Sequence, residues 1–313
     1  MIPYIVRRLA AGAGLALVIT LIVYLLIGTS FEDVARTILG QSATPEATAA
    51  LLEARGWDRP ILVQYVEWLA AALQGDFGAS VYTSLPVLPE VLSRLAVTLS
   101  LIVPALLITA TLSIVLGVWA ASRGGVVDRI AQGVSVFGYI IPGLLLAIGL
   151  VVLFGVQLGW LPATGYTRFG DDPAGWARSI TIPVIVLVVG GVANMSAQVR
   201  GRMVDELRRD YVRTLRTRGV SSRSIVLKHA LRNAGSPALT VMSLEFINMF
   251  GAALIIENVF ALPGFGNYAF NATLQGDIPV MLGISTFGVV LVTVVNLATD
   301  IANGWLNPKA RVH

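Results

Sequence analysis

The side chains of this sequence that could do chemistry are few, and most of them are carboxylates and arginines. The 313 residues include no cysteine and two histidines, His229 and His313. Disulfides and thiolate metal sites are therefore excluded, and clustered histidine ligands are not expected. His229 lies in a basic segment, where we expect a structural hydrogen bond, and His313 is the last residue. The sequence predicts no catalytic residue and no metal site.

The two lysines do not form a nucleotide-binding motif. A P-loop needs a Gly-Lys-Ser/Thr sequence that holds phosphates and magnesium. Lys228 follows Leu227, and Lys309 follows Pro308, so neither lysine fits. We expect that this chain is not an enzyme and does not hydrolyse nucleotide.

Glu245 is an ionisable residue in the middle of an apolar segment, residues 234–256. A carboxylate at the centre of a membrane costs about 2.5–3.5 kcal/mol, so it should face a bundle interior or a wet cavity. Asn248 and Asn194 add neutral polar groups to apolar stretches. We predict that Glu245, Asn248 and Asn194 line a translocation pathway. Hydrogen bonding between helices, worth about 0.6–2 kcal/mol per bond, is the alternative.

Ion-driven transport by this chain alone is disfavoured. Beside Glu245, the last apolar segment carries Asp300, which lies toward its end and could reach the membrane interface. Two such acids provide few sites between which a proton or a sodium ion could move. Secondary transporters often contain inverted repeats with broken helices, and residues 1–150 show no such symmetry with residues 151–313.

Composition places the chain in a membrane. Hydrophobic residues make up 56%, charged residues 13%, and the mean hydropathy is +0.78, whereas an average soluble domain carries roughly 25% charged residues. Since about 20 apolar residues cross the hydrocarbon layer, we predict an all-α integral membrane protein with six transmembrane helices. The expected spans are residues 9–28, 95–121, 130–158, 180–199, 234–256 and 280–306.

Positive charge sets the predicted orientation. With a cytoplasmic N-terminus, sixteen of the twenty-two Lys and Arg lie on inner segments and six on outer ones. Because Lys and Arg accumulate on the cytoplasmic side of membranes, both termini are expected there. Topology thus explains the pI of about 9.6, and no nucleic-acid partner is expected.

A long outer segment should fold into two short helices. Thr44 is a predicted N-cap with Pro45 at the first helical position, and Gly56 ends that helix. A second helix is expected from Ile61 to just before Gly75. This segment either packs as a cap on the outer end of the transmembrane helices or forms a docking surface for an extracytoplasmic partner. The regions expected are residues 1–28 (N-terminus and first span), 29–94 (extracytoplasmic) and 95–313 (five-span core).

A second outer segment combines bulky apolar residues with helix breakers. It runs from Glu257 through Phe260 to Pro263, Gly264 and Gly266. Non-helical backbone at membrane depth is tolerated only where protein or water satisfies its polar groups. We predict a partly re-entrant turn next to a pathway.

A basic segment, residues 200–233, holds ten of the twenty-two Lys and Arg. We predict a helix, a break at Gly219, which can take positive φ, and a second helix capped by Ser221 or Ser222. An apolar face of Tyr211, Val212 and Leu215 suits insertion into a protein groove. A loop that lies on the membrane surface is the alternative.

This basic segment resembles the coupling loop of binding-protein-dependent ABC importer permeases, most of all the dipeptide/oligopeptide group. The resemblance rests on the run from Asp210 to Ser221 and on Lys228 to Ala234. In the family this loop docks on an ATP-binding subunit, and its glycine corresponds to Gly219. The resemblance assigns ATPase coupling to Asp210, Tyr211, Val212, Thr214, Leu215, Gly219, Val220 and Ser221.

The resemblance covers nearly the whole chain. Matching fragments are Tyr4–Arg8, Gly75–Ser80, Pro86–Val87, Arg94–Leu101, Glu257–Gly266, Asp277–Val280 and Leu306–Arg311. The residues it assigns to an outer gate or signature are Glu257, Phe260, Pro263, Gly264, Gly266, Asp277 and Pro279.

The resemblance implies a permease in the bacterial plasma (inner) membrane that forms half of a pathway for di- or oligopeptides. It implies a second homologous permease subunit, two ATP-binding subunits that hold ATP and Mg²⁺, and an extracytoplasmic substrate-binding protein. Nickel chelates, glutathione, sugars or haem-like cargo are alternatives to peptides. A membrane scaffold protein without transport is the contrasting class.

Overall fold

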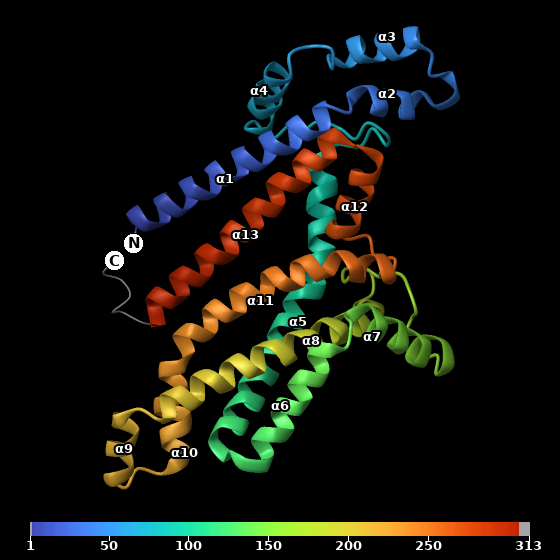
Figure 1. The fold of residues 1–313 in the computed structure, drawn as a ribbon. Coiled ribbons are helices and arrows are strands. Elements are labelled where there is room, and N and C mark those ends of the chain that lie inside the picture. Colours follow the sequence, from blue (N-terminus) through green and yellow to red (C-terminus); the bar gives the residue numbers. More distant parts are fainter. Residues whose placement is uncertain (1, 307–313) are drawn as a thin grey trace. The chain divides into compact units, whose positions relative to one another are not determined.

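The protein is helical throughout the part of the chain that the computed structural model describes, residues 2–306 (Figure 1). Its one isolated β-bridge in that range joins Ala79 to Pro86. The C-terminal fragment beyond Leu306, which contributed to the resemblance, lies outside the described residues. Contacts divide the chain into two compact units. Unit 1 comprises Met1–Val97 with Gly264–Val294, and unit 2 comprises Thr98–Pro263 with Val295–His313.

Unit 1 contains the first long apolar helix and the short helices that follow it. Its elements are α1 (Ile2–Gly28), α2 (Phe31–Leu39), a 3₁₀ turn (Gly40–Ser42), α3 (Pro45–Arg55), α4 (Ile61–Ala72), α12 (Phe265–Gln275), and the first parts of α5 (Val87–Arg123) and α13 (Ile278–Leu306). The two short helices expected between residues 44 and 75 are confirmed as α3 and α4. The Thr44 hydroxyl accepts from the Ala47 amide at 3.1 Å, and Gly56 ends α3 with φ 66°.

Helix α2 was not predicted from the sequence, and its N-cap residue Ser30 makes no side-chain capping hydrogen bond. Packing stabilises it instead. Phe31 stacks on Trp57 with ring centroids 5.4 Å apart and meets the edge of Tyr24 at 6.2 Å. These rings join α1, α4 and α13 in one apolar cluster that includes Tyr65 and Leu282. The short helices are therefore fixed to the C-terminal end of α1.

Unit 2 contains the remaining helices. They are the rest of α5, then α6 (Gly125–Ile140), α7 (Gly143–Leu150), a π-helical turn (Val151–Gln157), α8 (Pro173–Leu207), α9 (Asp210–Thr217), α10 (Ser222–Ser224), a second π-helical turn (Ile225–Ala230), α11 (Leu231–Val259) and the end of α13. Its core joins α5, α8 and α11 through buried residues that include Met195, Met203 and Ala230.

Five helices in the described residues are long and apolar enough to cross a membrane: α1, α5, α8, α11 and α13. The expectation of a single helix over residues 130–158 was wrong. Ile141 and Pro142 interrupt it between α6 and α7. Proline lacks an amide hydrogen, and its ring disfavours helical backbone at the preceding residue. The segment is consequently two shorter helices.

Gly117 allows α5 to approach α8 closely. A Cβ at this position would lie 2.8 Å from Val199 Cγ1 and 2.9 Å from the Arg200 backbone nitrogen. We predict that Gly117→Leu lowers the free energy of unfolding by about 1–3 kcal/mol, because overpacking forces the helices apart. Thermal unfolding of the detergent-purified protein, followed by tryptophan fluorescence, should show a lower midpoint.

Gly251→Leu is the matched control, since nothing lies within 4 Å of a Cβ at Gly251 in α11. Both variants add the same side chain to a helix in unit 2. Equal midpoints for the two variants would contradict the close packing of α5 on α8.

Candidate functional site

The basic segment folds as expected into a helix, a glycine break and a short second helix. Helix α9 ends at Thr217, and Gly219 follows with φ 75°, in the left-handed region where a side chain is strained. Ser221 then caps α10 by accepting from the Ser224 amide at 3.4 Å. Local sequence signals are thus sufficient to produce this shape.

The residues predicted for coupling differ in exposure. Val212 is 1% exposed and faces the interior of the chain. Tyr211, Leu215 and Val220 are half-buried. The exposed members are Asp210, Thr214, Gly219 and Ser221. Whether these residues contact another subunit remains a prediction, but Val212 already packs within this chain.

A buried carboxylate, Glu206, ties α9 to the end of α8, which the sequence analysis missed. Glu206 is 7% exposed. It accepts from the Tyr211 hydroxyl at 3.0 Å and pairs with Arg209 at 3.0 Å. Burial, together with this neighbouring carboxylate, raises the pKa of Tyr211. An acid five residues before a tyrosine, near a helix end, was the available signal.

The three predicted pathway residues line one cavity. Glu245 is 5% exposed, and the Asn194 side-chain amide donates to its Oε2 at 2.9 Å. Asn248 lines the same cavity, which has a volume of about 350 Å³. The hydrogen bond joins α8 to α11, as the interhelical alternative predicted. The same carboxylate also lines the cavity, and its role in a translocation pathway stays a prediction.

The interruption after α6 lines this cavity too, which the sequence analysis did not foresee. Tyr139, Ile141 and Gly143 form one wall. Backbone polar groups freed by a helix break are tolerated where a cavity or neighbouring protein satisfies them. Pro142 between two glycines, Gly138 and Gly143, was the available sequence signal.

Gly191 brings α8 close to the buried carboxylate. A Cβ at this position would lie 2.8 Å from Thr109 Cγ2, 2.8 Å from Met249 Cε and 3.0 Å from Glu245 Oε1. Its missing side chain therefore lets α5, α8 and α11 converge beside Glu245.

The predicted outer signature is divided between the two units. In unit 2, Glu257 is fully buried and accepts from the Thr98 hydroxyl, while the carbonyl of Phe260, which is 1% exposed, accepts from the Gly165 amide at 2.9 Å. Pro263, also in unit 2, is exposed. Gly264 and Gly266 are buried in unit 1 at the start of α12.

In unit 1, Asp277 joins two distant fragments of the resemblance. It is 3% exposed and accepts from the Ser80 hydroxyl at 2.5 Å and from the Val81 amide at 3.3 Å. Gly78, with φ 80°, packs near Pro279, since a Cβ on the glycine would lie 3.5 Å from the proline Cβ. The Gly75–Ser80 segment and the start of α13 thus form one structural site.

The buried carboxylates described above hold parts of the fold together. They are bonded to amides, hydroxyls or arginine. Each of them therefore joins two segments of the chain. Among residues 2–306, no group of three or more His, Asp or Glu side chains is placed to hold a metal ion.

Solved structures show a similar fold. The chain matches two crystal forms of the inward-facing MetNI methionine ABC transporter with TM-scores of 0.54 and 0.58 and 16% sequence identity. The matches cover 69% and 70% of this chain and 96% of each solved chain. At this identity they indicate the fold alone.

Curated relatives match at nearly full length. A probable peptide ABC transporter permease protein, y4tP, of Sinorhizobium fredii is 35% identical over 98% of this chain and 99% of its own. A putative peptide transport system permease protein of Brucella abortus is 35% identical over 99% of both. The glutathione transport system permease protein GsiC of Salmonella choleraesuis is 32% identical over 99% of both.

Two family descriptions together match almost the whole sequence. Residues 1–113 match the N-terminal part of binding-protein-dependent transport system membrane components. Residues 113–312 match the binding-protein-dependent transport system inner membrane component, which alone covers more than half of the chain. The chain belongs to the family of inner membrane components of binding-protein-dependent transport systems, and it is a multi-pass membrane permease.

Proposed function

We propose that this chain crosses the bacterial inner membrane six times with both termini in the cytoplasm. The third crossing is made by α6 and α7 with the break at Pro142. The excess of sixteen over six basic residues on inner segments supports this orientation. With this topology α9 lies on the cytoplasmic side, and α2, α3 and α4 lie outside.

The chain forms half of the translocation pathway of an ATP-driven importer. A second homologous permease subunit forms the other half, two ATP-binding subunits bind ATP and Mg²⁺, and a substrate-binding protein delivers cargo from outside. Helix α9 docks in a groove of one ATP-binding subunit through Thr214, Leu215 and their neighbours. The exposure of Thr214 and the turn at Gly219 support this role.

The observation that carries the proposal is a chain of hydrogen bonds that joins α9 to α8 and α8 to Glu245 of α11. Glu206 at the end of α8 binds Tyr211 of α9. Asn194, on the same α8, binds Glu245 of α11 at 2.9 Å. A displacement of α9 by the ATP-binding subunit would therefore move α8 and α11 together, as rigid-body gating requires.

The cargo is a di- or oligopeptide. The names of the relatives in Sinorhizobium and Brucella support peptides, and that of GsiC supports glutathione, which itself contains peptide bonds. Glu245 can attract the ammonium end of such a cargo, and the Asn194 and Asn248 amides can bond its carbonyl groups. Glutathione is accordingly the second candidate, ahead of nickel chelates or haem-like cargo.

Gly219→Val should uncouple transport from ATP hydrolysis. Valine is β-branched and strained at φ 75°, so the turn after α9 would change while the spans remain intact. In vesicles that contain the complete transporter, we expect peptide uptake to fall at least about tenfold, a barrier of about 1.4 kcal/mol. ATP hydrolysis should no longer respond to the binding protein.

Gly159→Val is the matched control. Gly159 also has positive φ, 63°, and open space around it, but it lies in a different loop. Wild-type uptake in Gly219→Val would contradict the coupling role of α9. So would a crosslinker at Thr214 that never captures an ATP-binding subunit in intact membranes.

Glu245→Gln should change transport without preventing assembly. The amide keeps the shape of the side chain and its contact with Asn194, but it removes the negative charge that faces the cavity. Uptake of a peptide with a free ammonium end should fall about tenfold or more, whereas uptake of an N-acetylated peptide should change little.

Ser243→Ala is the control for this experiment, since Ser243 lies on the same helix and bonds Asn296 at 2.7 Å without lining the cavity. Equal uptake by Glu245→Gln and the wild type would assign Glu245 to helix packing alone.

A further inference from the structure

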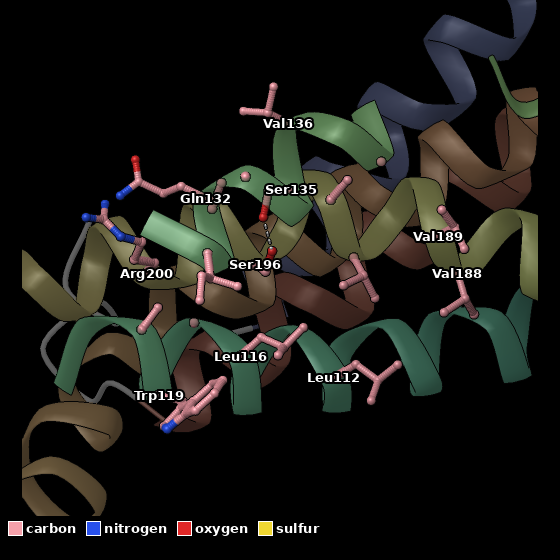
Figure 2. A pocket seen from close by; sticks show the side chains of 18 of the residues that line it. Leu112, Leu116, Trp119, Gln132, Ser135, Val136, Val188, Val189, Ser196 and Arg200 are labelled. Carbon is pink, nitrogen blue, oxygen red and sulfur yellow. Dashed lines mark hydrogen bonds between the residues drawn. The ribbon is translucent and has the colours of Figure 1, made fainter. Parts of the chain in front are cut away.

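Unit 2 contains a large apolar cavity between α5, α6 and α8 (Figure 2). It adjoins the Glu245 cavity, with which it shares Gly138, Ile141 and Val189 as lining residues. Its volume is about 910 Å³. Leu112, Leu116 and Trp119 of α5 form one wall, and Val188 and Val189 of α8 lie at the end away from Arg200. The hydrogen bond between Ser135 and Ser196, 3.0 Å long, joins α6 to α8 across its lining.

A second cavity adjoins the Arg200 end of the first. Its volume is about 480 Å³, and both cavities share Ala120 and Arg200 as lining residues. The smaller cavity has a mixed lining. Arg208, Arg216, Ser122 and Ser222 contribute polar groups, and Leu207, Ile225 and Val226 contribute apolar ones.

The smaller cavity carries a positive charge that this chain leaves uncompensated. Its lining has three arginines and one acid, Asp128, which accepts two hydrogen bonds from Arg200. Arg200 and Asp128 form an ion pair, so each offsets the charge of the other. Arg208 and Arg216 are exposed, and within residues 2–306 no acidic side chain forms an ion pair with either.

We propose that the two cavities together bind one anionic phospholipid of the cytoplasmic leaflet. The phosphate headgroup lies between Arg208 and Arg216, and the acyl chains lie along the apolar cavity. Arginine suits this role, because its planar guanidinium binds phosphate oxygens through two parallel hydrogen bonds. The inference rests on the proposed orientation, which places the arginine end inside.

A lipid fits this arrangement better than other occupants. A free phosphate would use only the arginine cavity, and an apolar helix of another subunit would use only the larger one. Trp119, which is 50% exposed, lies at the boundary between apolar and charged surfaces, where interfacial tryptophans gather. Basic recesses at the cytoplasmic ends of spans attract anionic headgroups.

Photolabelling tests the proposal. The complete transporter is placed in vesicles that contain phosphatidylglycerol or phosphatidylcholine with a diazirine in the acyl chain, and labelled peptides are identified by mass spectrometry. We expect phosphatidylglycerol to label α5 and α6 around Leu116 and Ile130 more strongly than phosphatidylcholine does. Arg208→Gln should reduce this preference about fivefold, and Arg208→Gln with Arg216→Gln further.

Two controls keep the test decisive. Arg213→Gln with Arg218→Gln removes the same charge from exposed arginines that do not line the cavity, and labelling should stay unchanged. Arg208→Lys keeps the positive charge and should retain most of the preference. Co-purification of the ATP-binding subunits checks that each variant assembles.

Equal labelling by the two lipids would overturn the proposal, since the two cavities would then hold any surrounding lipid without preference for an anionic headgroup. Loss of labelling in both arginine pairs would also overturn it, because general surface charge would be the cause. Labelling confined to another permease subunit would overturn it as well. The lipid would then lie outside these cavities, and a protein would be their occupant. A variant that loses the lipid preference but keeps peptide uptake leaves the importer function intact.

Discussion

Two buried carboxylates, each bonded to a neighbouring helix, constrain the structure of unit 2. Glu245 and Glu206 are 5% and 7% exposed, and each needs a hydrogen-bond donor that a neighbouring element supplies. Asn194 of α8 bonds Glu245 of α11, and Tyr211 of α9 bonds Glu206 of α8. Any arrangement that separated these helices would leave a buried carboxyl group without its hydrogen-bond donor, which costs about 1–3 kcal/mol. The three elements therefore keep a fixed register.

This register connects the contacts of α9 with Glu206 to the cavity beside Glu245. Met203 and Ala230 are buried in the same core cluster, so the end of α8 packs against the π-helical turn that precedes α11. Because protein interiors are close-packed, displacement of α9 shifts its partners instead of compressing them. The cavity beside Glu245 has walls on α6, α7, α8 and α11. Movement of α8 and α11 would change its shape.

The break between α6 and α7 has a corresponding physical reason. A helix interrupted in hydrocarbon would expose unpaired backbone groups at a large cost. Here Ile141 and Gly143 face the Glu245 cavity, where polar side chains lie nearby. The interruption and the buried carboxylate thus occupy the same polar environment. Outside this cavity, the lining between α5, α6 and α8 is almost wholly apolar, as lipid tails require.

Sequence alone determined the features that depend on neighbouring residues. Thr44 and Gly56 cap α3, and Gly219 with Ser221 shapes the segment after α9, since each device acts within a few residues. Apolar length likewise identified α1, α5, α8, α11 and α13, because spanning a bilayer is a local requirement. The residues predicted for the pathway came from the same rule, as a carboxylate in an apolar run needs a polar environment.

Only the tertiary structure decided which distant residues meet. Ser80 bonds Asp277 across 197 residues, and Asn194 bonds Glu245 across 51. Helix α2 formed without a capping signal because Phe31 stacks on Trp57. The inward position of Val212 also depended on packing, since a helical face shows which side is apolar but not what covers it. Long-range contacts arise from the whole chain folding at once, and no local pattern encodes them.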